Sequence, residues 1–175
     1  DLSSLKIPAA SLSCASRETL RISDMVLEMF DYVLLALKTN DYEIIKKIRE
    51  RERTVDRLYD AIKNYLARMN KKNMTEKEVF KYMQILSFAT NLEHVGDIID
   101  KSLIQSVRKK INNQDSFSRQ GFAEISNFHG EVRHNIKAAQ HLLMTNNLQI
   151  AKDLIADKGK LRDEEMHCFE SHIKR

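Results

Sequence analysis

The sequence has very few residues that interrupt helices. Its 175 residues include no Trp, one Pro and four Gly. An all-β domain needs turn residues every few positions, so this composition excludes a fold rich in tight turns and favours long helices. The apolar fraction of 42% is enough to fill a globular core, so the chain is long and apolar enough for one domain or two small repeats.

Other absences exclude further classes of protein. The longest strictly apolar run, Tyr32 to Leu37, is far shorter than the roughly 20 residues of a membrane span. The net charge is +4, but no aromatic residues are interleaved with the basic ones, which disfavours nucleic acid as a partner. Cys14 and Cys168 follow no disulfide or metal pattern and indicate a reducing, cytoplasmic setting. The first residue is Asp rather than Met, which suggests a processed or excised piece.

Motifs of common enzyme chemistry are also missing. We find no Gly-rich phosphate loop, no nucleophile elbow and no Cys/His zinc spacing. The sequence therefore argues against an enzyme.

Apolar periodicity and capping residues predict an all-α chain of five helices. Asn40 with Glu43, and Thr75 with Glu78, resemble capping boxes that open the second and third helices. Residues 1–16, which contain Pro8 and several Ser, are expected to form an irregular lead-in. The expected helices span about 18–38, 40–70, 75–111, 117–145 and 146–175. Because the links are short, neighbouring helices should be antiparallel.

The sequence contains an internal repeat with an offset of 106 residues. Thr39-Asn40 recurs as Thr145-Asn146, and the apolar register is kept on both sides. We therefore divide the chain into a lead-in (1–16), a first three-helix repeat (17–112) and a second repeat (117–175). A third helix of the second repeat would begin near position 181, beyond the last residue. This predicts an exposed face on the last two helices.

Acidic residues interrupt the apolar seams of the second and third helices. In the second helix, Glu52 lies within a heptad seam, and Asp56 and Asp60 follow at four-residue steps on its flank. In the third helix three consecutive seam positions are acidic. They are Glu93, Asp97 and Asp100. A second, fully apolar stripe predicts that the third helix is buried on two sides.

These acids should meet, because an antiparallel pair centred on residue 72 places Glu52 and Asp56 at a similar height to Glu93 and Asp97. Clustered carboxylates repel one another, so something must neutralise them. One interpretation is a hard metal ion such as Mg, Mn, Ca or Fe. The other is ion pairing at a solvated groove, with cations such as Arg51, Arg53 or Arg57. Spacing alone leaves both open.

Three further groups of residues have a less specific pattern. The acids of the first helix (Asp24, Glu28 and Asp31) are expected on its solvent side. Glu131 and His134 have the spacing of one pair of a di-iron bundle motif, an architecture that needs two such pairs and two further Glu. His134 and His141 are expected at the surface.

The sequence of residues 91–101, NLEHVGDIIDK, resembles the signature of the PhoU family. Residues 52–62 look like the partner motif on the preceding helix. Residues 8–20 are similar to the segment that follows the membrane part of bacterial sodium/phosphate cotransporters. The resemblance covers nearly the whole chain, and the motif at 91–101 is its most specific part.

The resemblance implies two repeats of three helices and a metal site. By position, the implied ligands are Glu52, Asp56, Glu93 and Asp97, with Asp60 and Asp100 as possible extra ligands. Fe, Mg, Mn and Zn are not distinguished. The second repeat departs from this pattern, because Lys158 and Arg162 stand where Glu52 and Asp56 stand in the first. Fixed positive charges repel a cation, so we expect at most one metal site, within residues 1–112.

The function implied by the resemblance is a non-catalytic, metal-binding regulatory domain of phosphate transport. We expect the cytoplasmic domain of a sodium/phosphate cotransporter, at the inner face of the membrane, with the membrane part as its partner. The alternatives are a stand-alone regulator of phosphate uptake, a metal-free helical adaptor and a metalloenzyme. A partner, a second copy in a homodimer or the rest of a longer polypeptide would cover the exposed face of the second repeat.

Overall fold

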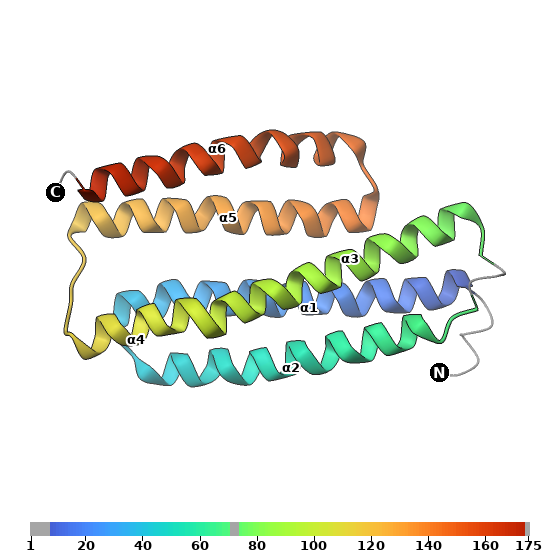
Figure 1. Cartoon of the computed structure of the whole chain (residues 1–175), viewed down its shortest axis with the longest axis horizontal. Coiled ribbons are helices and arrows are strands. Elements are labelled where there is room, and N and C mark those ends of the chain that lie inside the picture. Colours follow the sequence, from blue (N-terminus) through green and yellow to red (C-terminus); the bar gives the residue numbers. More distant parts are fainter. Residues whose placement is uncertain (1–7, 71–73, 174–175) are drawn as a thin grey trace.

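The computed structural model describes residues 8–70 and 74–173 of the chain, and within them every regular element is a helix. The elements are α1 (Pro8–Thr39), α2 (Tyr42–Ala67), α3 (Glu76–Ile98), a π-helical turn η3 (Ile99–Leu103), α4 (Ile104–Asn112), α5 (Arg119–Thr145) and α6 (Leu148–Ile173). Because α3, η3 and α4 continue without a break, the fold has the five long rods shown in Figure 1. The prediction of an all-α bundle of long antiparallel helices is confirmed.

The helices pack in layers around α1. It contacts α2 and the α3–α4 rod on one side and α5 on the other, while α6 packs mainly on α5 (Figure 1). In the described residues the buried apolar side chains lie almost entirely between α1, α2 and α3–α4, and Leu143 of α5 is the exception. α6 has no buried side chain among those described. The predicted exposed face of the second repeat is therefore present.

The prediction of an irregular lead-in is wrong for residues 8–16, which form the first turns of α1. Pro8 is the first helical residue, where its fixed φ suits a helix and its missing N–H costs nothing. Ser11, Leu12 and Ala15 are buried, so packing against the core stabilises these turns despite their serines. Residues 1–7 of the lead-in lie outside the described residues.

The turns before α2 and α6 have the same conformation. Asn40 and Asn146 both adopt the left-handed region, with φ of 57° and 52°. Each donates its N–H to the carbonyl four residues earlier and so ends the preceding helix. The prediction that Asn40 caps α2 is wrong, because Asp41 accepts the Glu43 N–H at 2.8 Å instead. Asn147 caps α6 in the same way, 2.9 Å from the Gln149 N–H.

The capping box at the start of α3 is confirmed. Thr75 accepts the Glu78 N–H at 3.3 Å, and the Glu78 carboxylate accepts the Thr75 N–H at 2.8 Å. The first turns of α3 then rise away from α2 and reach beyond its end (Figure 1). Val79 and Met83 of these turns are consequently 44% and 57% exposed, because α2 does not extend far enough to cover them.

None of the described helices is long and apolar enough to cross a lipid bilayer.

Candidate functional site

Five of the six predicted site residues form one surface, which we call the acid face. It consists of Glu52 and Asp56 of α2, Glu93 and Asp97 of α3, and Asp100 of η3. Glu93, Asp97 and Asp100 are half-buried, with side chains 22%, 28% and 23% exposed. The sixth residue, Asp60, is 64% exposed and pairs with Lys63 at 2.9 Å, one turn beyond the acid face. Its role as an extra ligand stays a prediction.

Contacts between α2 and the α3–α4 rod fix the register of the acid face. Arg49 Nε lies 3.5 Å from Asp100 Oδ1, and the hydroxyls of Tyr59 and Thr90 are 3.3 Å apart. These pairs place Glu52 level with Asp97. By the same register Asp56 is level with Glu93.

The acids therefore meet at a shared height, as predicted, but the centre of the antiparallel pair lies near residue 75 rather than 72. The difference arises because α3 overhangs the end of α2. At the centre of the acid face the helices are packed, since a Cβ placed on Gly96 would be in van der Waals contact with Val55 Cγ1, at 3.7 Å.

The clustering of these carboxyl groups changes the pKa of Glu52. Burial, a hydrogen bond with Asp56 and the charges of Asp56, Asp100 and Asp97 raise its pKa from 4.5 to about 7. Burial disfavours the charged form, and the neighbouring carboxylates add to the effect. Near neutral pH the acid face is therefore able to take up or release a proton at Glu52.

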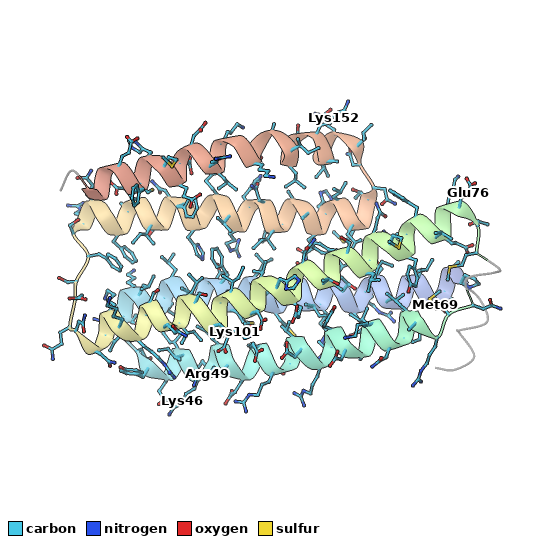
Figure 2. The ribbon with its side chains drawn as sticks, in the orientation of Figure 1. Lys46, Arg49, Met69, Glu76, Lys101 and Lys152 are labelled. Carbon is cyan, nitrogen blue, oxygen red and sulfur yellow. The ribbon has the colours of Figure 1, made fainter. Side chains whose placement is uncertain are left out.

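Basic side chains from the same two helices already neutralise part of the acid face. Lys101 Nζ lies 2.6 Å from Asp97 Oδ2, and Arg49 approaches Asp100 from α2. Figure 2 shows Arg49 and Lys101 at the same level along the α2–η3 contact.

The three arginines that were predicted to pair with the acid face have other partners in the structure. Arg51 binds Glu28 of α1 at 2.9 Å instead. Arg53 and Arg57 each donate to a backbone carbonyl one turn earlier.

The π-helical turn at Ile99–Leu103 was not predicted. Such a turn inserts one residue into a helix, and π turns are frequent at functional sites. Here it carries Asp100 and Lys101. Asp100 Oδ1 is buried without a hydrogen bond, although Arg49 lies within ion-pair distance. No residue type in 99–103 signals the extra residue.

The donors of the acid face suit a hard metal ion, because carboxylate oxygens are the ligands such ions prefer. The buried, unbonded oxygen of Asp100 is also a suitable donor. The positions of these side chains fit a metal site less well than their chemistry does. Among the described residues, no three His, Cys, Asp or Glu side chains are grouped closely enough to hold one ion. Metal binding would therefore require the acids to exchange Lys101 and Arg49 for the ion.

The first helix makes polar and aromatic contacts with α5 that were not predicted from the sequence. Asp24 and Asp31, expected to face solvent, bind α5: Arg133 Nε lies 2.9 Å from Asp31 Oδ1, and Gln140 Nε2 lies 2.7 Å from Asp24 Oδ1. His129 stacks on Phe30 with ring centroids 4.2 Å apart. The expectation is wrong because α5 covers this side of α1.

The two histidines expected at the surface are exposed, as predicted. His134 and His141 line a cleft of about 640 Å³ between α1, α5 and α6. Asp153 and Asp157 lie on its opposite wall. Among the described residues, Glu131 and His134 belong to no group of three or more side chains that could hold a metal ion.

Comparison with known proteins finds one family model that matches the part of the chain containing the acid face. Residues 19–102 match the model of the PhoU domain. The match begins in α1, includes all of α2 and α3, and ends within η3, so every residue of the acid face lies inside it.

Relatives match over the full length of the chain. It is 28% identical over 175 residues to the Escherichia coli K12 protein named "Putative inorganic phosphate export protein YjbB", and 29% identical to the Salmonella typhimurium protein of the same name. The chain spans about a third of the length of these relatives, 32% in both cases. No solved structure matches the chain at a significant level.

Proposed function

We propose that this chain is a non-catalytic regulatory domain of a phosphate transporter, acting as the cytoplasmic domain of a sodium/phosphate cotransporter. The observation that carries the proposal is the coincidence of the PhoU match with the acid face, on a chain whose relatives are named for phosphate export. The partner would be a membrane part, and the domain would act at the inner face of the membrane. A stand-alone PhoU-type regulator would use the same surface.

The regulatory device we propose is cation binding at the acid face. Glu52, Asp56, Glu93 and Asp97 would supply hard oxygen ligands, with Asp100 and Asp60 as extra ligands. Support comes from the shared height of the acids, the raised pKa of Glu52 and the unbonded oxygen of Asp100. Iron, magnesium, manganese and zinc remain candidates. Lys101 and Arg49 would compete with the ion, so occupancy would depend on its concentration.

A second candidate is a metal-free helical adaptor. The observation that favours it is the neutralisation of Asp97 by Lys101 and of Asp100 by Arg49. In this case the acid face is a set of ion pairs that holds α2 against α3–α4, and the domain acts only through the partners that it binds.

The experiment that separates these candidates is metal analysis of the purified protein. We expect bound metal in the wild type and its loss in Glu93→Ala and Asp97→Ala. Lys158→Ala and Arg162→Ala are matched controls from the second repeat and should leave the metal content unchanged. Metal retained by both acid variants would overturn the site, and no metal in any preparation would favour the adaptor.

The transport role has its own test. A chimera in which this chain replaces the matching third of the Escherichia coli relative should restore phosphate movement across the membrane in cells lacking that relative. The Asp97→Ala chimera should alter its regulation. If the chimera moved no more phosphate than the relative from which this domain had been deleted, a role in phosphate transport would be contradicted.

A further inference from the structure

The ammonium group of Lys101 lies beside the acids of both helices that form the acid face. Its Nζ is 2.6 Å from Asp97 Oδ2. The hydrogen bond with Asp97 raises the pKa of Lys101, and the charges of Asp97, Glu93 and Asp56 act in the same direction. Carboxylates of α2 and of α3 therefore attract the same ammonium group. Lys101 thus places a positive charge in the region where these carboxylates gather.

The Lys101 side chain is the movable partner of its ion pair. It is 67% exposed, whereas the side chain of Asp97 is 28% exposed. Lysine has a flexible four-carbon stem and a strongly hydrated head, so a change of rotamer can carry the ammonium group from the carboxylate into water. The exposed cation can therefore leave while the half-buried acid stays in place.

Arg49, the other cation of the acid face, is held in a different way. It extends from α2 to Asp100 of η3, with Nε 3.5 Å from Oδ1, so its ion pair joins two rods of the bundle. Lys101 and Asp97 belong to one continuous rod, because η3 follows α3 without a break. Separating Lys101 from Asp97 therefore leaves the contact between α2 and the α3–α4 rod intact. Of the two cations, Lys101 is the one that can be released without disturbing the packing.

Charge determines which ions can take the place of Lys101. Lys101 and Arg49 supply two positive charges to the five carboxyl groups of the acid face. A monovalent ion brings the same charge as the ammonium group that it would displace, and the tethered amine has the advantage of a high effective concentration. A divalent ion brings one more positive charge to a cluster with an excess of acids, so its attraction is larger. The competition with Lys101 therefore favours divalent ions.

We propose that Lys101 is a built-in counter-ion of the acid face, which gives up Asp97 to a divalent cation but not to a monovalent one. This inference rests on the proposed function, because it assumes that the acid face binds cations. The released ammonium group moves into water, since its side chain is already exposed. Lys101 thus converts the binding of an ion into a change at the molecular surface. An ion pair with a purely structural role would stay closed at any concentration of divalent ions.

The reactivity of the Lys101 amine tests the proposal. The full chain is treated with an amine-acetylating reagent with and without Mn²⁺, and mass spectrometry measures the rate of acetylation at each lysine. We expect Mn²⁺ to increase the rate at Lys101 by about fivefold, the upper limit of the protection that an exposed ion pair gives. Lys160 is the matched control, because it forms a similar pair with Asp157 at 2.8 Å in α6, and its rate should not change. Potassium chloride should act on Lys101 no differently from choline chloride at equal ionic strength.

A variant that lacks the amine provides a second measurement. Lys101→Met keeps an apolar side chain of similar length and removes the competing charge, so it should bind Mn²⁺ about fivefold more tightly than the wild type. Electron paramagnetic resonance of free Mn²⁺ measures both affinities. Lys160→Met, which breaks the matched pair in α6, should leave the affinity unchanged. Circular dichroism verifies that the variants are folded.

The results distinguish a failure of this inference from a failure of the proposed function. Equal Mn²⁺ affinities of the wild type and Lys101→Met, with unchanged acetylation of Lys101, would overturn the counter-ion role and leave cation binding intact. Binding by Lys101→Met alone would support the counter-ion role and show that the wild type holds the ion too weakly to act as proposed. Absence of Mn²⁺ from both proteins would overturn both proposals.

Discussion

The two repeats of this chain have the same turns but very different cores. Asn40 and Asn146 end their helices in the same left-handed conformation, and Asp41 and Asn147 cap the helices that follow. Ile48 of α2, however, is fully buried, whereas its counterpart Leu154 of α6 is half-buried. The two repeats therefore share the conformation of their turns but not the burial of their side chains.

The difference shows what a third helix contributes. Two antiparallel helices bury only the seam between them, so their outer apolar residues remain accessible. In the first repeat α3–α4 covers that side and also brings the acids that face Glu52 and Asp56. In the described part of the second repeat the equivalent side is open and positively charged. Most of the stability of the described residues is therefore expected to reside in the first repeat, which holds nearly all of the buried apolar side chains.

The largest predicted effect is the loss of unfolding free energy when an apolar side chain is truncated in the core of the first repeat, compared with the same truncation in the second. Ile48→Ala should reduce the free energy of unfolding by about 2–5 kcal/mol, because it leaves a cavity among fully buried side chains. Leu154→Ala, at the equivalent position, should cost about 1 kcal/mol, since its half-buried side chain is not enclosed. Urea denaturation measures both. Equal losses would mean that the two repeats are packed alike.

The next prediction compares two helical glycines. Gly96→Leu should destabilise the protein by about 1–3 kcal/mol, because the new side chain must push Val55 and α2 away. Gly159→Leu in α6 should instead stabilise it by up to about 1 kcal/mol, since a Cβ there meets nothing within 4 Å and Gly is a poor helix former. Thermal melting of the two variants side by side checks the opposite signs.

A third prediction concerns the joint between the repeats. Arg133→Ala removes the ion pair with Asp31 and should weaken the contact of α5 with α1 by about 1 kcal/mol. Hydrogen exchange should become faster in α5 and α6 and stay unchanged in α2 and α3. Arg162→Ala on α6 is the control and should alter neither region. Equal acceleration in all helices would show that the repeats unfold as one unit.

A fourth prediction concerns the dependence of stability on pH. The pKa of Glu52 is about 7 in the folded chain against 4.5 for an ordinary Glu, so between these values the folded state holds a proton that the unfolded state releases. Stability should therefore fall as the pH rises from about 4.5 to about 7 and then level off. Glu52→Gln should remove this part of the fall in the melting temperature. Lys158→Gln, its counterpart, should leave the fall in place.

The acid face shows how far sequence reasoning reached. The helix spacing predicted that acids of α2 and α3 meet at one height, and the register of Arg49 with Asp100 and Tyr59 with Thr90 confirms it. The pairing of individual acids was not predictable, because the turn between the helices places α3 beyond the end of α2. The pairing of Arg49 with Asp100 was missed for the same reason, whereas Lys101 lies four residues after Asp97 and is a local pair that helix spacing could have indicated.

What the sequence alone determined is local. The five helices, the capping box at Thr75 and the repeated Asn turns follow from periodicity and from hydrogen bonds between residues a few positions apart. What only the tertiary structure decided depends on residues far apart in the chain. The π turn that carries Asp100, the burial that raises the pKa of Glu52 and the use of Asp31 to hold α5 all depend on packing between helices, which local sequence does not specify.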